Sequence, residues 1–109
     1  MIRDDTVFLR HILDATNKIQ EYTKGMDYEG FRASSLVQDG VIRQLEIIGE
    51  ATKNLSREIR EKHPYIPWKD LAGMRDKLIH QYFGVDIAGV WDTAEQDIPA
   101  LKNYLIKLL

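Results

Sequence analysis

Apolar residues recur at helical intervals along almost the whole chain, and this periodicity restricts the fold more than any other feature. Near the N-terminus the steps are alternately four and three residues, through Phe8, Ile12, Ala15, Ile19 and Tyr22. Steps of this size place side chains on one face of an α-helix, whereas a half-buried strand needs a period of two. The sequence therefore predicts an all-α fold.

Residues that favour helix ends divide this pattern into segments. Asp4 and Asp5 offer side-chain oxygens to the first free amides of a helix, and Gly25 suits the position after a helix C-terminus. Helices are expected over about 5–24, 35–62, 68–83 and 87–108, with a single short turn of helix over 27–31.

Several interruptions are expected within and between these helices. The segment 35–62 is unusually long for one helix, which favours a break near 52–56. The prolines of 64–67 form a rigid connector, Gly73 can interrupt the helix that follows, and Pro99 predicts a kink or a new start. With short connections, these segments predict an antiparallel up-down bundle of four to five helices.

The composition narrows the class of protein. At 109 residues the chain predicts one domain over 1–109. The absence of cysteine excludes disulfide frameworks, thiolate metal sites and cysteine nucleophiles. The net charge of −2 means that any RNA contact must use a local basic patch. No apolar run approaches the ~18 residues of a membrane span, and the charged N-terminus is unlike a signal peptide, so we expect a cytoplasmic protein without membrane contact.

The segment from Gly73 to Phe83 carries the most chemical information. On a helical wheel Arg75 falls within an apolar arc, where an unpaired guanidinium is costly, so an acidic side chain, a second subunit or an anionic ligand must face it. Asp76 and His80 lie one turn apart on the same wheel, within pairing reach. Arg75 and His80 are about 140° apart, so two facing copies of the helix converge them more readily than one. This geometry predicts a homodimer with a shared site on the two-fold axis.

The pattern Arg75-x4-His80-x-Tyr82 matches the catalytic motif of HEPN-domain ribonucleases, and its surroundings resemble the HepT branch of that group. The resemblance covers essentially the whole chain. Three further parts carry it: 41–51 resembles the central helix of the branch, 67–76 its approach to the motif, and Trp91 with 99–101 its last helix.

This resemblance implies a HEPN-like dimeric bundle with metal-independent endoribonuclease activity in a cleft between subunits. It implies RNA as substrate, rather than DNA, and no cofactor. The setting would be a prokaryotic toxin–antitoxin pair, in which the antitoxin is a nucleotidyltransferase of the MntA type that transfers AMP from ATP to the motif tyrosine. By position, that AMPylation acceptor is Tyr82.

The residue types of the motif suit RNA cleavage by the adjacent 2′-hydroxyl. His80 can exchange protons near neutral pH, as base for the hydroxyl or acid for the leaving oxygen. Arg75 can hold two non-bridging phosphate oxygens in its planar fork. Asp76 is expected to orient His80, and no metal ion is required. Two subunits would supply two histidines, so the base and the acid could be separate residues.

Each of these assignments has a structural alternative. Arg75 can be an ion-pair residue, His80 a packed or surface histidine, and Tyr82 a packing residue. His11 and His63 are expected to be structural or surface residues. Charged side chains share one face of the segment 35–62, as either a solvated ion-pair stripe or support for the Arg75 site: Arg43, Glu46, Glu50, Lys53 and Arg57.

Two functions of different class remain open. The first is a ribonuclease toxin, which the intact motif favours. The second is a non-catalytic helical dimer that binds a nucleotidyltransferase partner and is modified by it, which the net acidic charge favours. A DNA-binding helix-turn-helix over 55–83 has little support, because its recognition helix would be largely apolar and its connector is long and rich in proline.

Overall fold

The computed structural model of the chain describes residues 4–80 and 84–109, and at Arg75, Lys77, Ile79 and His80 it describes the backbone alone. Within these ranges helices make up most of the chain, and a small hairpin of two short strands interrupts them. The all-α class predicted from the sequence is therefore confirmed. None of the described helices is long and apolar enough to cross a membrane.

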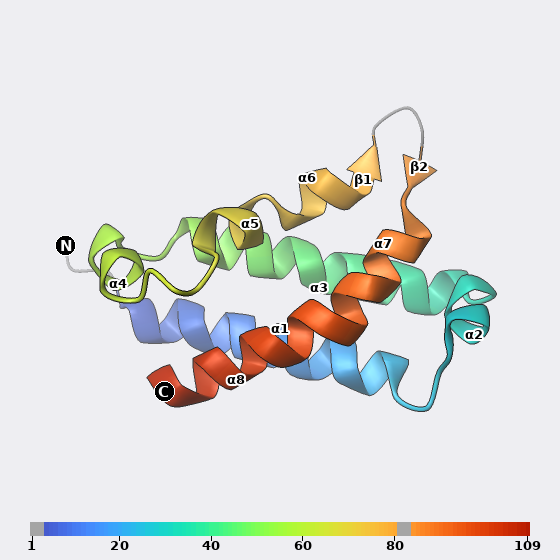
Figure 1. Cartoon of the computed structure of the whole chain (residues 1–109), viewed down its shortest axis with the longest axis horizontal. Helices are drawn as coiled ribbons and strands as arrows, with labels where there is room; N and C mark the ends of the chain where they lie inside the picture. The colour runs from blue at the N-terminus through green and yellow to red at the C-terminus, as the bar shows by residue number, and fades with distance from the viewer. Residues whose placement is uncertain (1–3, 81–83) are drawn as a thin grey trace.

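Figure 1 shows two long antiparallel helices with shorter helices laid across them. The described elements, in chain order, are α1 (Asp5–Thr23), α2 (Tyr28–Arg32), α3 (Ser35–Lys53), α4 (Arg57–Lys62), α5 (Trp68–Ala72), α6 (Met74–Leu78), β1 (Ile79–His80), β2 (Gly84–Val85), α7 (Ile87–Asp92), the π-helical segment η1 (Thr93–Asp97) and α8 (Ile98–Leu108). The expected four to five helices are thus divided into more and shorter segments.

Side-chain caps begin the helices of the first half of the chain. Asp4 accepts a hydrogen bond from the amide of Thr6 at 3.0 Å, and Ser34 accepts one from the amide of Val37 at 3.3 Å. Such bonds satisfy amides that lack a partner within the first turn. The predicted start of the first helix and the predicted short turn near 27–31 are confirmed.

The predicted break near 52–56 is also confirmed, and the structure shows what holds it. α3 ends at Lys53, and Ser56 caps the separate helix α4 by accepting from the amide of Ile59 at 3.2 Å. Asp5, at the start of α1, accepts from the Ser56 amide at 2.7 Å and from its hydroxyl at 2.6 Å. The break is therefore fixed to the first turn of α1.

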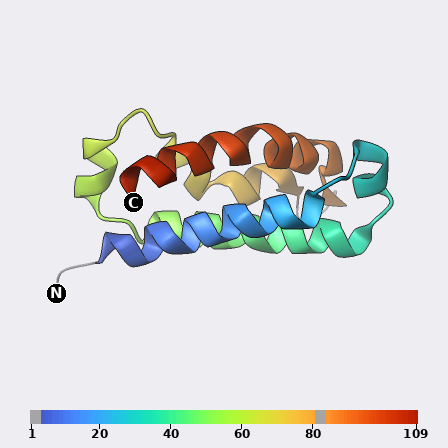
Figure 2. The same cartoon turned by 90° about the horizontal axis from the view of Figure 1, so that it is seen from below.

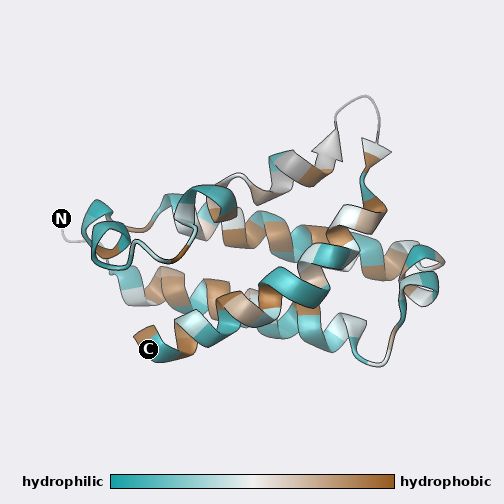
Figure 3. Ribbon diagram, viewed as in Figure 1, coloured by the Kyte–Doolittle hydropathy of each residue, from teal (hydrophilic) through white to brown (hydrophobic). Residues whose placement is uncertain are grey.

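The core lies between α1, α3 and the C-terminal helices. Figure 3 shows hydrophobic residues repeating along α1 and α3 with hydrophilic residues between them. The stripe of α1 follows the prediction, which also includes Leu9 and Thr16, but it departs at the end of the helix, where Tyr22 is 37% exposed and Thr23 is buried instead. Each buried threonine of α1 donates its hydroxyl hydrogen bond to a backbone carbonyl of the preceding turn, so burial leaves no unpaired polar atom there.

The remaining helices cover the α1–α3 pair. α8 packs on α1, whereas α5 and α6 pack on α3, and Figure 2 shows α5 and α6 between α3 and α8. α7 contacts α2, where the rings of Phe31 and Trp91 lie 5.2 Å apart. The backbone stays helical from α7 through η1 into α8, with no side-chain cap at Asp97. The interruption expected near Pro99 is therefore the π-helical turn η1 that directly precedes α8, and Pro99 lies in the first turn of α8.

The segment 68–83 departs most from the prediction. The expected interruption at Gly73 is present, between α5 and α6. The helix after it, however, ends at Leu78 instead of continuing to residue 83, and β1 then pairs with β2 in antiparallel register. The amide of Asp86 donates to the carbonyl of Leu78 at 2.9 Å and closes this reversal. Gly84 has a φ of +82°, which an L side chain rarely adopts. The continuous helix through residue 83 is therefore wrong, and wheel positions beyond Leu78 do not apply.

Candidate functional site

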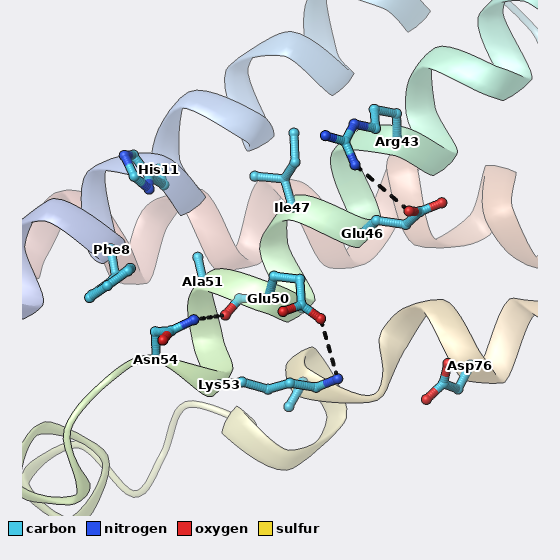
Figure 4. Close-up of a pocket in the computed structure, with 12 residues that line it drawn as sticks. Phe8, His11, Arg43, Glu46, Ile47, Glu50, Ala51, Lys53, Asn54 and Asp76 are labelled. Atoms are coloured by element: carbon cyan, nitrogen blue, oxygen red, sulfur yellow. Dashed lines mark hydrogen bonds and ion pairs between the residues drawn. The ribbon is translucent and has the colours of Figure 1, made fainter.

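A hollow of about 470 Å³ lies between α1, α3 and the α5–α6 segment (Figure 4). Four of the residues singled out in the sequence line it: Arg43, Glu46 and Glu50 from α3, and Asp76 from α6. Figure 4 shows Asp76 on α6, across from the charged face of α3. The structure therefore brings the expected supporting residues of α3 to the same hollow as the acidic residue of the motif segment.

Ion pairs along α3 form the polar wall of this hollow. Arg43 Nη1 lies 3.8 Å from Glu46 Oε2, and Lys53 Nζ lies 3.6 Å from Glu50 Oε1. The Arg43 and Lys53 side chains are 68% and 55% exposed, and exposed pairs of this kind contribute little to stability. These cations can therefore turn toward an anion that enters the hollow at small energetic cost.

The ion-pair interpretation of the charged stripe is correct for the part that lies on α3. Arg57 does not belong to that face, because the break after Lys53 places it on α4, where its Nε lies 2.7 Å from Glu61 Oε1. The other charged residues of the stripe both form ion pairs and line the hollow, so the two interpretations offered by the sequence are compatible.

Apolar groups from three helices form the rest of the lining. Ile47 and Ala51 come from α3, Ala72 comes from α5, and Phe8 comes from α1. His11 also lies at the rim, with its ring edge-on to Phe8 at a centroid distance of 6.1 Å. The hollow thus combines an apolar and aromatic side with a wall of both charges.

A glycine sets the distance between α3 and α5 at this place. Gly49 is buried, and a Cβ added there would lie 3.3 Å from the backbone oxygen of Ala72 and 3.6 Å from that of Leu71. The missing side chain lets the end of α5 approach α3 closely. The α6 segment begins directly afterwards, so Gly49 helps to position the backbone that carries Arg75 and Asp76.

The structure places the motif residues only in part. The backbone of Arg75 lies in α6 next to Asp76, and the backbone of His80 lies in β1, opposite Gly84. Tyr82, the predicted AMPylation acceptor, lies outside the described residues. The one-turn spacing of Asp76 and His80 assumed a continuous helix and is wrong, whereas their catalytic roles stay predictions. Among the side chains that the structure describes, no group of three or more His, Cys, Asp or Glu residues is arranged to hold a metal ion.

The contribution of α1 to the hollow could not be found from the sequence. The sequence predicts Phe8 as part of the apolar stripe and His11 as a structural or surface residue, and no local pattern links either to the motif segment. His63 is different: it ends α4, its ring nitrogen Nδ1 lies 3.1 Å from the Tyr65 hydroxyl, and its carbonyl accepts from Trp68 Nε1 at 2.9 Å. The structural role expected for His63 is therefore supported by its contacts.

The fold and this hollow together define a small helical-bundle protein with a polar site beside an Arg-x4-His-x-Tyr motif. The chain belongs to the HepT-like ribonuclease family: the sequence profile described as "Ribonuclease HepT-like" matches residues 12–108. The family resemblance predicted from the sequence is thereby confirmed. No solved structure gives a significant match to the chain.

Relatives of known name agree with this assignment. "Putative RNase MJ0125" of Methanocaldococcus jannaschii is 52% identical over 107 residues, which are 98% of this chain and 92% of that protein. "Probable ribonuclease HepT" of Thermococcus cleftensis is 46% identical over 108 residues, 99% of this chain and 98% of that protein. "Gamma-glutamylcyclotransferase and putative RNase MJ0434" of M. jannaschii is 49% identical over 109 residues, all of this chain and 49% of that protein. The family and these names indicate a ribonuclease.

Proposed function

We propose that this protein is a metal-independent endoribonuclease, the toxin of a prokaryotic toxin–antitoxin pair in the cytoplasm. Arg75 and His80 cleave the RNA, and AMPylation of Tyr82 by a nucleotidyltransferase of the MntA type silences them. The observation that carries this proposal is the complete motif within a chain that belongs to the HepT-like ribonuclease family. The position of Asp76, at a hollow that also holds Arg43, supports it, because an anionic substrate needs a cation near the motif.

The chemistry requires only groups that this chain possesses. The 2′-oxygen of a ribose attacks the adjacent phosphorus while its proton passes to an imidazole. The bond from phosphorus to the 5′-oxygen of the next nucleotide breaks, and that oxygen takes a proton from an acid. The products are a 2′,3′-cyclic phosphate and a free 5′-hydroxyl. Arg75 stabilises the charge on the phosphorane, and His80 transfers the protons.

A homodimer completes this site in the proposal. Each chain carries a single histidine in the motif, whereas the reaction needs both a base and an acid. A two-fold arrangement of the motif segments supplies both imidazoles and both arginines to one cleft. Light scattering at micromolar concentration would test it, and a monomer that cleaves RNA at full rate would exclude the shared site.

The central experiment compares RNA cleavage by three variants with that of the unmodified protein. We expect His80→Ala to lower the rate by about 10²- to 10⁴-fold, because it removes the proton-transfer group. Arg75→Lys should also be severely impaired, because an ammonium cannot reproduce the two-point contact of a guanidinium. His63→Ala is the control, since it removes an imidazole far from the motif in sequence. Normal cleavage by His80→Ala, or loss of cleavage in EDTA, would exclude the mechanism.

Silencing through Tyr82 has its own test. A nucleotide phosphate on this hydroxyl would add negative charge and bulk where the RNA phosphate must bind, so it would oppose cleavage. Incubation with an MntA-type nucleotidyltransferase and ATP should add one or more AMP groups to the chain, as measured by intact mass. Tyr82→Phe should gain none and should escape silencing, while Tyr65→Phe, which alters an exposed tyrosine, should be modified normally. Equal mass gain in Tyr82→Phe would place the acceptor elsewhere.

The non-catalytic interaction module is the second candidate function. It is favoured by the charge of the hollow, where the described lining includes the carboxylates of Glu46, Glu50 and Asp76 but only two permanent cations, Arg43 and Lys53. An acidic surface of this kind repels RNA. AMPylation of a chain that cleaves no RNA under any condition would support this function over the first.

A further inference from the structure

A second hollow, of about 300 Å³, lies on the other side of α5 and α6, between these helices and the C-terminal part of the chain. Its floor is apolar and consists of the buried side chains of Leu71, Met74 and Leu101. Tyr65 and Tyr104 form one wall, with ring centroids 5.7 Å apart in an edge-on arrangement. Tyr65 is 57% exposed although it lines this apolar hollow, so more than half of the residue's surface remains accessible to a ligand.

Two carboxylates stand at the edge of this hollow. Asp70 lies in the first turn of α5, and Asp97 is the last residue of η1, directly before α8. Both are exposed, and neither forms an ion pair with a described residue. The helix dipole accounts for an acidic residue near a helix start, but it does not account for two of them flanking an apolar and aromatic floor. The described residues of the lining include no Lys, Arg or His that would neutralise them.

This combination has a specific complement. An apolar floor takes the methylene stem of a long side chain, open tyrosine faces attract a cation, and two carboxylates attract it further. A planar guanidinium satisfies all three, since it stacks on aromatic rings and bonds to carboxylates through its fork. RNA is excluded as the occupant, because its phosphates would meet Asp70 and Asp97.

We propose that this tyrosine–aspartate groove binds an arginine side chain, flanked by apolar residues, on a segment of a partner protein. Among the residues whose side chains the structure describes, those that line this groove and those that line the hollow beside Asp76 have no member in common. The groove can therefore hold a partner on one side of α5 and α6 while the hollow of about 470 Å³ that Asp76 lines, the motif hollow, remains accessible on the other side. Binding here and cleavage of RNA are separable properties of the chain.

A peptide titration followed by two-dimensional ¹H–¹⁵N NMR tests this groove. The probe is acetyl-Leu-Ala-Arg-Leu-Ala-amide, and the matched control peptide has Gln in place of Arg. We expect saturable shifts of amides near Leu71 and Leu101 with the arginine peptide and weaker binding of the glutamine peptide. In the double variant Asp70→Asn/Asp97→Asn, affinity for the arginine peptide should fall about two- to fivefold for each carboxylate removed. The matched control, Asp14→Asn/Asp39→Asn, removes two exposed carboxylates elsewhere and should bind as the unmodified protein does.

Several results would overturn the proposal. They are equal affinity for both peptides, shifts centred outside the groove, no shifts at millimolar peptide, or shifts of groove amides by an RNA oligonucleotide. A changed sedimentation coefficient of the double variant would assign the groove to contact between copies of this chain. RNA cleavage by the double variant should be unchanged, and its loss would also contradict the proposal. Inactivity of the unmodified protein toward RNA would refute the proposed function alone and leave the peptide result standing.

Discussion

Replacing each of two glycines of α3 with alanine tests how closely α5 packs against that helix. Gly40 and Gly49 both lie inside α3, so alanine at either position removes the same helix-propensity penalty of about 0.8–1 kcal/mol. The two positions differ in what the new Cβ would meet. At Gly40 it would lie 3.2 Å from the ring of Tyr22, which is partly exposed and can turn toward solvent. At Gly49 it would lie 3.3 Å from the backbone oxygen of Ala72, which can move only with α5.

These surroundings predict effects of different sign. Gly40→Ala should raise the free energy of unfolding by about 0.5–1 kcal/mol, because the ring can yield. At Gly49 the packed backbone must shift, and overpacking of this kind costs about 1–3 kcal/mol. The gain in helix propensity offsets about 1 kcal/mol of this cost, so the effect of Gly49→Ala on the free energy of unfolding should range from neutral to a loss of about 2 kcal/mol. The difference between the two variants should therefore be about 0.5–3 kcal/mol.

Urea unfolding followed by circular dichroism at 222 nm measures both free energies. The dependence on urea concentration should be the same for both variants, since the same surface is exposed on unfolding. Gly49→Ala should also cleave RNA more slowly than Gly40→Ala, because Ala72 leads directly into the α6 segment that carries Arg75. If both substitutions stabilise the protein equally, the close approach of α5 to α3 does not constrain the motif segment, and the reasoning is refuted.

Three further substitutions can be measured by the same unfolding experiment. Asp5→Ala should lower the free energy of unfolding by about 2–3 kcal/mol, because it removes both acceptors of Ser56, at 2.7 and 2.6 Å. Ile48→Ala should lower it by about 2–5 kcal/mol, because this side chain is fully buried. Trp68→Phe should lower it by about 1–2 kcal/mol through loss of the bond from Nε1 to the carbonyl of His63. A loss below about 0.5 kcal/mol in any of them would contradict the corresponding contact.

The first half of the fold could be predicted from the sequence because its signals are local. Asp4 and Ser34 cap helices whose first amides lie within three residues, so the sequence pattern and the hydrogen bond coincide. The break before α4 is expected from the length of the segment 35–62 alone, and the structure adds that Ser56 caps the helix after it. What could not be predicted is that Asp5 would reach across to Ser56, because that contact depends on the tertiary pairing of α1 with α3.

The motif segment could not be predicted, because its apolar residues fit two backbone conformations. Leu78 and Ile79 suit the helical wheel, but Ile79 equally suits a strand. The choice depends on the reversal at Gly84 and on the bond from the Asp86 amide to the Leu78 carbonyl, which joins residues on either side of the hairpin. Likewise, Phe8 reaches the motif hollow only through the packing of α1 on α3. Contacts between distant segments thus decided both the end of α6 and the composition of the site.

The π-helical segment Thr93–Asp97 makes the length of this region as important as its composition. A π-turn holds one residue more than an α-turn, so the residues after it are rotated by about 100° relative to an unbroken α-helix. Val90 before the segment and Leu105 after it are both fully buried, although α7 packs on α2 and α3 while α8 packs on α1. Loss of one residue within this segment would close the π-turn into an α-turn and leave Val90 and Leu105 on the same faces, whereas loss of two residues would turn one of these side chains toward solvent. This part of the gene should therefore accept the loss of one codon far more readily than the loss of two.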